Sequence, residues 1–420
     1  MNKRIIATGA VVSAMALGLS ACGGGSDSGD SKTIKVVAAD YGDKASNASK
    51  VYWADVKKEF EKANKGYKVD VQVINWNEID KSVKNMIQAG NEPDLLQTGG
   101  YADKVADDLL YKADEVLSPK TRENLIPTFA KAGEVDGTQY GIPWVSSSRV
   151  MFYNKDVLKK AGVKTPPKNW DELAAAAKKI KSAKAAEIPY ALPLGPEETQ
   201  GETMMWELGN GGGYTDASGK YTLDSAKNTE TFDWLRTNLV KPGLTYANPA
   251  STDRKTAFAD FAAGKVGMLN GHPSLIQMAK EGKVDYGVVP IPGKDGPLKS
   301  TLGVADWMMA FKDGGAEKAG VKKFLDFTYS KKMLQFDEMY NLMPVTQDAL
   351  KTMQSNGKHK DLEPFFKVLP NAKFYPLGDT SWDVVSAEIK KTGGKAVAGD
   401  AKQVLGDLQK KAESAAADAK

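Results

Sequence analysis

The chain has 420 residues, of which 41% are hydrophobic and 26% charged, and its formal net charge is +4. This is an ordinary globular composition, and the length suits about two or three domains. Lysines, aspartates and glutamates are interspersed throughout, so the sequence lacks the concentrated basic face that nucleic-acid binding needs. We therefore expect no nucleic-acid partner.

The N-terminus predicts a secretory signal peptide, residues 1–21. Lys3 and Arg4 precede an apolar run over residues 5–19, which is short for a membrane span of about 20 residues. The sequence Leu-Ser-Ala-Cys at residues 19–22 looks like the lipobox of bacterial lipoproteins. Cys22 is the single cysteine, so we expect it to carry a lipid, and no disulfide can form within the chain. An ordinary signal peptide with an incidental cysteine is the alternative.

A glycine- and serine-rich stretch follows, and residues 22–32 are expected to be the lipidated cysteine and a flexible tether. The body begins with predicted strands at 33–39, 68–74 and 94–97, separated by predicted helices at 45–63 and 79–89. This alternation predicts a parallel sheet covered by helices, with ligands bound beyond the carboxyl ends of the strands. Those ends carry Asp40 and Tyr41, Trp76, and Gln97 with Thr98.

The second part of the chain mixes helices and strands in the same way. Helices are predicted at 170–184, 230–239 and 252–263, strands at 188–192, 286–290 and 303–311, a further strand after residue 263, and mostly helix from residue 316 onward. The class expected from this pattern is α/β.

Residues that could support catalysis or metal binding are scarce. The chain has two histidines, His272 and His359, and no cysteine beyond Cys22, which argues against zinc sites and cysteine nucleophiles. The glycine cluster at 209–213 lacks the Lys and Ser/Thr of a phosphate-binding loop. We predict no catalytic residue, metal or cofactor. Polar and aromatic residues at the ends of elements suit sugars, whose hydroxyls need polar partners and whose C–H faces need rings.

Several segments resemble the extracellular solute-binding proteins of carbohydrate ABC transporters, which are akin to maltose-binding protein. The segments that carry the resemblance are GTQYGIP at 137–143, MFYNKD at 151–156, WDEL at 170–173, FADFAAGKVGM at 258–268 and YGVVPIPG at 286–293. The resemblance covers essentially the whole chain after the signal peptide.

The resemblance implies a type II periplasmic-binding-protein-like fold, in which two α/β lobes joined by hinge crossings close over a ligand. Lobe one would comprise residues 33–145 and 303–344, and lobe two residues 148–301 and 347–415. The polar run Ser146–Arg149 would then lie at a crossing between lobes, in contact with water or ligand. If Arg149 is instead paired to a carboxylate away from the cleft, its role is structural and only the serines remain candidates.

The resemblance also implies ligand contacts, position by position. These are Asp40, Tyr41, Gln97, Trp144, Ser147, Arg149, Gln200, Trp206, Asn270, His272, Gly303, Asp306, Trp307, Asp379 and Trp382. The family often places a stacking tryptophan where this chain has His272, and that departure argues against a long, maltodextrin-like site.

The function implied is that of a monomeric, lipid-anchored sugar-binding protein on the outer face of the bacterial cytoplasmic membrane. It would capture a mono- or short oligosaccharide and deliver it to the permease subunits of an ABC transporter, without catalysis. Two alternatives stay open. One is a secreted carbohydrate-active hydrolase, which needs opposed carboxylates such as Asp40 with Asp306 or Asp379; the other is a binding protein for a non-sugar solute.

Overall fold

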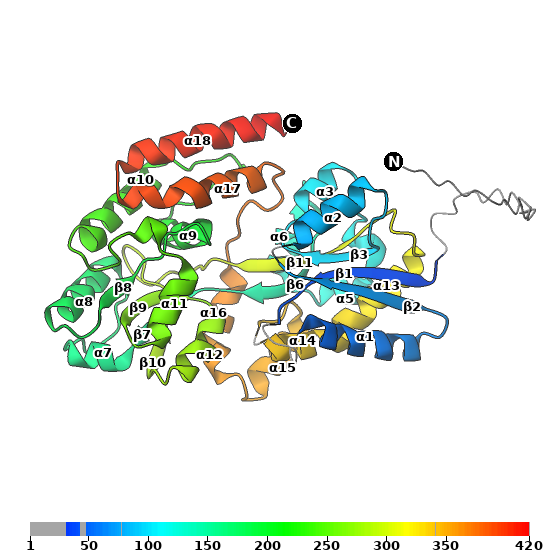
Figure 1. Ribbon diagram of the computed structural model, residues 1–420, viewed down its shortest axis with the longest axis horizontal. Helices are drawn as coiled ribbons and strands as arrows, with labels where there is room; N and C mark the ends of the chain where they lie inside the picture. Colours follow the sequence, from blue (N-terminus) through cyan, green and yellow to red (C-terminus); the bar gives the residue numbers. More distant parts are fainter. Residues whose placement is uncertain (1–30, 43–47, 77, 341, 420) are drawn as a thin grey trace, which may run out of the picture.

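The computed structural model describes residues 31–42, 48–76, 78–340 and 342–419, so the predicted signal peptide and Cys22 lie outside the described residues. Figure 1 shows two bodies side by side, each containing its own sheet. We call the body on the right of that view lobe one and the body on the left lobe two. Among the described residues, no helix combines the length and apolarity needed to cross a membrane.

Lobe one is built on a five-stranded sheet with the order β2-β1-β3-β11-β6. The strands are β1 (Thr33–Ala39), β2 (Lys68–Ile74), β3 (Leu95–Thr98), β6 (Ile142–Ser147) and β11 (Val304–Ala310). β1 is parallel to β2 and β3, as the sequence predicts. β11 is antiparallel to both β3 and β6, so the whole sheet is mixed rather than parallel.

Helices surround this sheet. They are α1 (Ser49–Ala63), α2 (Ile79–Gln88), α3 (Ala102–Ala106), α4 (Ala113–Val116), α5 (Pro119–Glu123), α6 (Pro127–Ala132), α13 (Lys318–Phe327) and α14 (Met333–Tyr340), with a small ribbon of β4 (Glu134–Val135) and β5 (Thr138–Gln139). The core beneath α1 is aromatic: Trp144 stacks on Trp53 with ring centroids 5.3 Å apart.

Lobe two contains a four-stranded sheet with the order β10-β7-β9-β8. The strands are β7 (Val150–Asn154), β8 (Ile188–Ala191), β9 (Val266–Gly271) and β10 (Tyr286–Val289). Its helices are α7 (Lys155–Lys160), α8 (Trp170–Ser182), α9 (Thr199–Gly209), α10 (Ala226–Leu235), α11 (Arg254–Ala262) and α12 (Ser274–Glu281). The Asn169 side chain caps α8 by accepting from the Glu172 N–H at 2.8 Å.

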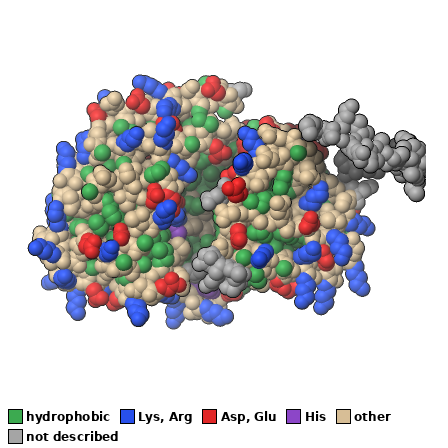
Figure 2. Space-filling view, viewed as in Figure 1, with side chains coloured by type: hydrophobic (Ala, Val, Ile, Leu, Met, Phe, Trp, Pro, Cys, Tyr) green, Lys and Arg blue, Asp and Glu red, His purple; other side chains and the backbone are tan. Residues whose placement is uncertain are grey.

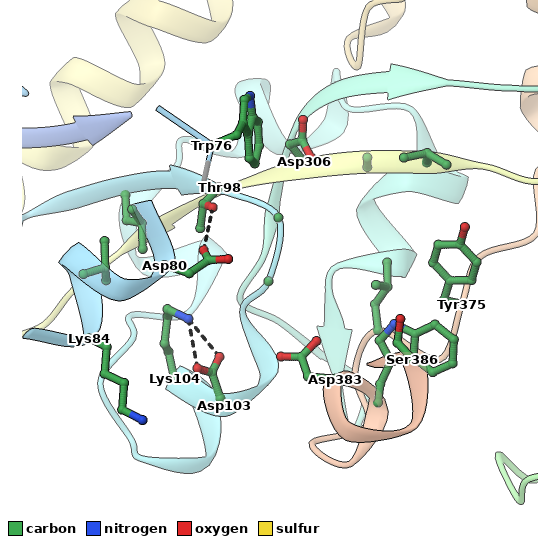
Figure 3. Close-up of a pocket in the computed structure, with 18 of the residues that line it drawn as sticks. Trp76, Asp80, Lys84, Thr98, Asp103, Lys104, Asp306, Tyr375, Asp383 and Ser386 are labelled. Atoms are coloured by element: carbon green, nitrogen blue, oxygen red, sulfur yellow. Dashed lines mark hydrogen bonds and ion pairs between the residues drawn. The ribbon is translucent and has the colours of Figure 1, made fainter. Parts of the chain in front are cut away.

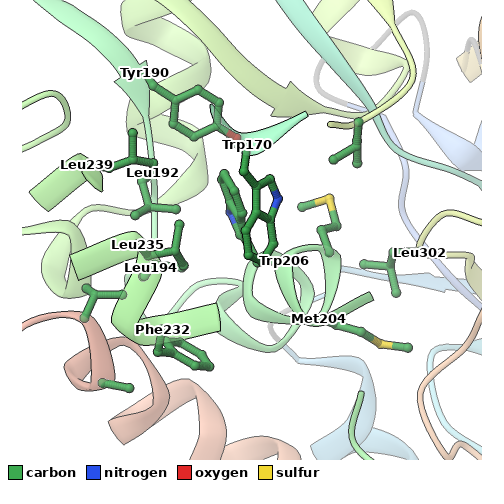
Figure 4. Close-up of a cluster of buried hydrophobic side chains, with 14 of the residues drawn as sticks. Trp170, Tyr190, Leu192, Leu194, Met204, Trp206, Phe232, Leu235, Leu239 and Leu302 are labelled. Atoms are coloured by element: carbon green, nitrogen blue, oxygen red, sulfur yellow. The ribbon is translucent and has the colours of Figure 1, made fainter. Parts of the chain in front are cut away.

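The C-terminal part of the chain returns to lobe two. After α15 (Gln347–Ser355) and α16 (Glu363–Val368), helices α17 (Trp382–Thr392) and α18 (Ala401–Asp418) pack against it. Leu405 and Leu408 of α18 share one buried cluster with Trp170 and Trp206, the two central indoles of Figure 4. Helices α17 and α18 therefore help to build lobe two.

The polar run at 146–149 ties the crossings between the lobes together. Ser146 donates its hydroxyl to the Pro344 carbonyl at 2.8 Å, and Ser148 donates to the Phe365 carbonyl at 3.3 Å. Thr301 accepts from the Arg149 N–H at 3.1 Å and donates to the Arg149 carbonyl at 2.7 Å. These side chains satisfy backbone groups where four segments of the chain meet, which accounts for the buried polar residues in an apolar run.

Candidate functional site: the cavity between the lobes

A cavity of about 890 Å³ lies between the two lobes. Figure 2 shows the molecule hollowed along this boundary, and Figure 3 shows the walls. Lobe one contributes Trp76, Asp80, Lys84, Thr98, Asp103, Lys104 and, from β11, Asp306. Lobe two contributes Gln200, Trp382, Asp383, Ser386 and Lys390. Gly303 and Tyr375 come from segments outside the named helices and strands.

The lobe-one wall follows the carboxyl ends of the parallel strands. Trp76 comes just after β2, and Thr98 is the last residue of β3. The Thr98 hydroxyl donates to the Asp80 carboxylate at 3.2 Å, which fixes the first turn of α2 at the end of β3. This is the edge at which ligands bind in sheets of this kind.

Asp306 lies on β11, where the register with β6 is irregular between Asp306 and Trp307. The Tyr41 hydroxyl donates to Asp306 Oδ2 at 2.5 Å, and Gln97 Nε2 donates to the Tyr41 oxygen at 2.8 Å. Burial raises the pKa of Asp306 to about 6, and the hydrogen bond from Tyr41 partly opposes that shift. Asp306 is therefore a charged acceptor above about pH 6.

Carboxylates face each other across the cavity. Asp383 on α17 points toward Asp103 and Lys104 on α3, with Asp80 nearby (Figure 3). Lys104 Nζ already pairs with Asp103 at 2.9 Å. The loss of solvent inside the cavity raises the pKa of Asp383, and Asp103 raises it further. The walls therefore carry more negative than positive charge at this point.

An aromatic stack forms part of the lobe-two wall. The rings of Tyr375 and Trp382 are 5.1 Å apart at 21°, and Tyr214 lies behind Trp382 at 5.6 Å. Trp382 is 5% exposed. The buried Tyr375 hydroxyl has no hydrogen-bond partner among the described residues. The stack therefore presents a ring surface to the cavity, whereas the Tyr375 hydroxyl is buried beside Gly201 of α9.

A partly buried ionic network backs the lobe-two wall. Arg149 donates to Glu198 at 2.8 Å, and Arg254 contacts both Glu198 at 2.9 Å and Glu197 at 2.7 Å. His272 accepts from Arg254 and lies 4.9 Å from the Phe258 ring. Burial and the two arginines hold the pKa of His272 well below its usual range, so the imidazole is neutral at pH 7.

Four of the residues predicted from the sequence line the cavity: Gln200, Gly303, Asp306 and Trp382. Three predicted tryptophans, Trp144, Trp206 and Trp307, are instead fully buried in the hydrophobic clusters and are not among the residues that line it.

The predicted polar residues outside the cavity have structural partners in most cases. Asp40 accepts from the Ser49 N–H at 2.8 Å, and Asp379 accepts from the Ser381 N–H at 2.9 Å and lines a separate hollow. Ser147 accepts from Arg149 at 3.0 Å. Asn270 is 2% exposed, and its amide has no partner among the described residues.

The sequence does not predict several of the residues that form the walls of the cavity. Asp80, Asp103, Lys104, Tyr375, Asp383 and Ser386 were not predicted. Most of them are helix residues whose sequence context is that of an ordinary solvated face. The aromatic pair Phe374-Tyr375 before Pro376, in an otherwise helical region, is the one signal that could have drawn notice.

The comparisons with known proteins agree with this geometry. The model of the bacterial extracellular solute-binding protein family matches residues 55–361. This chain belongs to that family. Membership places it among extracytoplasmic solute-binding proteins and not among enzymes.

The relatives span most of the chain. A binding protein of Brucella abortus is 30% identical over 401 residues, which is 92% of this chain and 94% of the relative. The diacetylchitobiose binding protein DasA of Streptomyces coelicolor is 26% identical over 79% of each chain. The sn-glycerol-3-phosphate-binding periplasmic protein UgpB of Agrobacterium fabrum is 28% identical over 63% of this chain and 58% of its own length.

The fold has close counterparts among solved structures. The cyclic α-maltosyl-1,6-maltose binding protein of Arthrobacter globiformis superposes with a TM-score of 0.75 over 92% of this chain and 98% of that chain, at 17% identity. The two-lobed, maltose-binding-like α/β fold expected from the sequence is therefore confirmed.

Proposed function

We propose that this protein captures a mono- or short oligosaccharide in the cavity between its lobes and delivers it to an ABC permease. The observation that carries the proposal is the pairing of the Tyr375–Trp382 stack with carboxylates in one interlobe cavity. Rings cover the C–H faces of a sugar, and carboxylates accept hydrogen bonds from its hydroxyls. The volume of about 890 Å³ lies in the range of small-molecule sites, about 300–1,000 Å³.

The names of two relatives bear on the class of ligand: one supports a sugar, and the other suggests a phosphorylated solute as the alternative. DasA is named for a disaccharide and UgpB for a phosphate ester. The acidic walls of this cavity, with Asp383 opposite Asp80 and Asp103, disfavour a phosphate group. We therefore place an uncharged sugar ahead of a phosphorylated solute.

The mechanism of capture is closure of the lobes. The proposed lobes are residues 33–145 with 303–344 and residues 148–301 with 347–415, so cavity residues from both meet the same ligand. A ligand stabilises the closed form by its differential affinity for that form. Cys22 would carry the lipid that holds a monomeric protein near its permease, through the tether at 22–32.

The test is calorimetric titration of the soluble chain from residue 23 onward against a panel of mono- and disaccharides, with glycerol 3-phosphate as the competing solute. Saturable binding of a sugar, weakened by Trp382→Ala, supports the proposal. Binding of glycerol 3-phosphate alone would replace it with a phosphate-ester function. No saturable binding of any panel member would contradict it.

The anchor needs a separate experiment. The full chain, including the predicted signal peptide, is expressed in a bacterium alongside Cys22→Ala, and the cells are fractionated. We expect the native chain in the membrane fraction and the variant in the soluble or secreted fraction. A variant that stays with the membrane would rule out lipidation at Cys22 as the anchor.

A further inference from the structure

We propose that Tyr41 and Gln97 are positioning residues that hold one oxygen of the Asp306 carboxylate, so that the other oxygen stays available to a ligand in the cavity. This inference rests on the proposed function, because it concerns how the cavity binds its ligand. It also changes the role predicted for both residues, since the resemblance implies that each contacts the ligand directly.

The direction of the hydrogen bonds is fixed by the backbone. The Ala39 N–H donates to Gln97 Oε1 at 3.1 Å, which turns the Gln97 amide nitrogen toward the Tyr41 oxygen at 2.8 Å. An amide nitrogen can only donate, so the Tyr41 oxygen accepts and its own proton is left for Asp306. The Tyr41–Asp306 distance of 2.5 Å is that of a charge-assisted bond.

The positioning residues are themselves rigid. Gln97 is 1% exposed. The Tyr41 ring is held edge-on by Trp76 at 5.5 Å and by Phe336 at 5.1 Å. Rotation of the tyrosine would therefore disturb a packed cluster, and its hydroxyl has one stable direction.

Asp306 reaches the cavity, whereas Tyr41 and Gln97 are not among the residues that line it. Apart from Tyr41, the Asp306 carboxylate has no hydrogen-bond partner among the described residues. The Oδ2 oxygen of Asp306 thus already accepts a hydrogen bond from Tyr41, and the other carboxylate oxygen can accept one from a ligand hydroxyl. A carboxylate held on one side in this way loses little side-chain freedom when it binds.

The arrangement makes affinity depend on pH through Asp306. The charged groups that face the cavity from neighbouring elements are Asp80 and Lys84 of α2, Asp103 and Lys104 of α3 with Asp107 just after it, and Asp383 and Lys390 of α17. None of these is a cause of the shift at Asp306, whose pKa of about 6 reflects burial, opposed by Tyr41. Affinity should therefore fall as the pH drops through about 6, because the protonated acid is a weaker acceptor.

The experiment compares Tyr41→Phe with Tyr101→Phe. Tyr101 is a matched control: it is buried in the same lobe, its ring lies 5.1 Å from Trp307, and its hydroxyl donates to the Ala132 carbonyl rather than to Asp306. The first readout is a carbon-13 titration of the Asp306 carboxyl in the ligand-free protein, assigned with Asp306→Asn. The second is sugar affinity between pH 5 and 8.

We expect Tyr41→Phe to raise the Asp306 midpoint by about one pH unit, since a hydrogen bond to a charged group is lost. The midpoint of the affinity profile should move with it, whereas Tyr101→Phe should leave both midpoints unchanged even if both variants melt earlier. Asp306→Asn should remove the part of the pH dependence that is centred near pH 6. An Asp306 midpoint that is the same in Tyr41→Phe and in the native protein would overturn the inference.

The two proposals can fail separately. If the native protein binds no saccharide, the proposed function fails, while the ligand-free carboxyl titration still decides whether Tyr41 holds Asp306. If a sugar binds with an affinity that does not change between pH 5 and 8, the function stands and the role of Asp306 is refuted.

Discussion

The Arg149 guanidinium lies 2.8 Å from the Glu198 carboxylate, and its side chain is 4% exposed. The pair joins the crossing after β6 to the start of α9 and is not among the residues that line the cavity. A buried pair adds little net stability. Removal of Arg149 would leave Glu198 with Arg254 as its remaining cationic partner, at 2.9 Å. We infer that Arg149 fixes the crossing rather than contacting the ligand.

We predict that Arg149→Met lowers the free energy of unfolding by about 1.5–3 kcal/mol, the cost of losing a charge-assisted hydrogen bond while Glu198 keeps Arg254 as a partner. The measurement is urea unfolding, with Arg122→Met on the short helix α5 as a control for loss of an arginine. Sugar affinity of the folded fraction should change little. A large loss of sugar affinity without loss of stability would show that Arg149 acts in ligand binding.

A second prediction separates cavity tryptophans from core tryptophans. Trp382→Ala should weaken sugar binding by about 1–3 kcal/mol, because a stacking surface is lost. Trp144→Phe should instead lower stability with little change in affinity, since Trp144 is fully buried and stacked on Trp53. Calorimetric affinity and thermal melting, measured on both variants, distinguish the two effects. Equal losses of affinity in the two variants would contradict the assignment of the ligand site to this cavity.

The local elements could be predicted from the sequence because their signals are local. The alternation at 68–74 gives β2, and the Asn-Trp-Asp-Glu start gives α8 at Trp170. The pairing of β11 could not be predicted in this way. Its partner β3 lies about 200 residues earlier in the chain, and local order suggests only parallel neighbours.

The site was harder to predict than the fold, for a physical reason. Trp382 begins α17, whereas Trp144 lies within β6. Because β6 is buried on both faces, strand alternation cannot say which of its sides meets the cavity. Asp383 looks like an ordinary solvated residue in the first turn of a helix. Its role arises because α17 packs on lobe two opposite α3, a long-range placement with no local signal.

The acidic residues that line the cavity predict that the protein binds anionic ligands less tightly than neutral ones. Asp383→Asn should improve binding of a sugar phosphate about two- to fivefold relative to the same neutral sugar, since one repulsive charge is removed at a solvated distance. The measurement is competition titration of the two ligands at low salt. Asp407→Asn, on the exposed part of α18, is the control and should change neither affinity. If Asp383→Asn leaves the ratio of the two affinities unchanged, the charge of Asp383 does not determine the preference for neutral over anionic ligands.

The last prediction concerns stability and pH. Glu207 on α9 is 1% exposed, one of its carboxylate oxygens has no partner among the described residues, and burial raises its pKa from 4.5 to about 8. Because the folded state holds a proton that the unfolded state releases, this group favours folding below about pH 4.5, and that contribution is lost as the pH rises toward 8. The loss is about 1.4 kcal/mol per pH unit at most within this window.

Glu207→Gln keeps the shape and removes the titration, so we expect the variant to melt higher than the native protein at pH 8. Its melting temperature should also change less between pH 5 and 8. Glu202, also buried on α9 with a pKa of about 8, continues to titrate in this variant, so the slope should flatten without vanishing. Glu281→Gln, at an exposed position on α12, controls for the loss of one carboxylate and should follow the native curve. A Glu207→Gln variant that follows the native curve at every pH would show that Glu207 does not hold its proton in the folded protein.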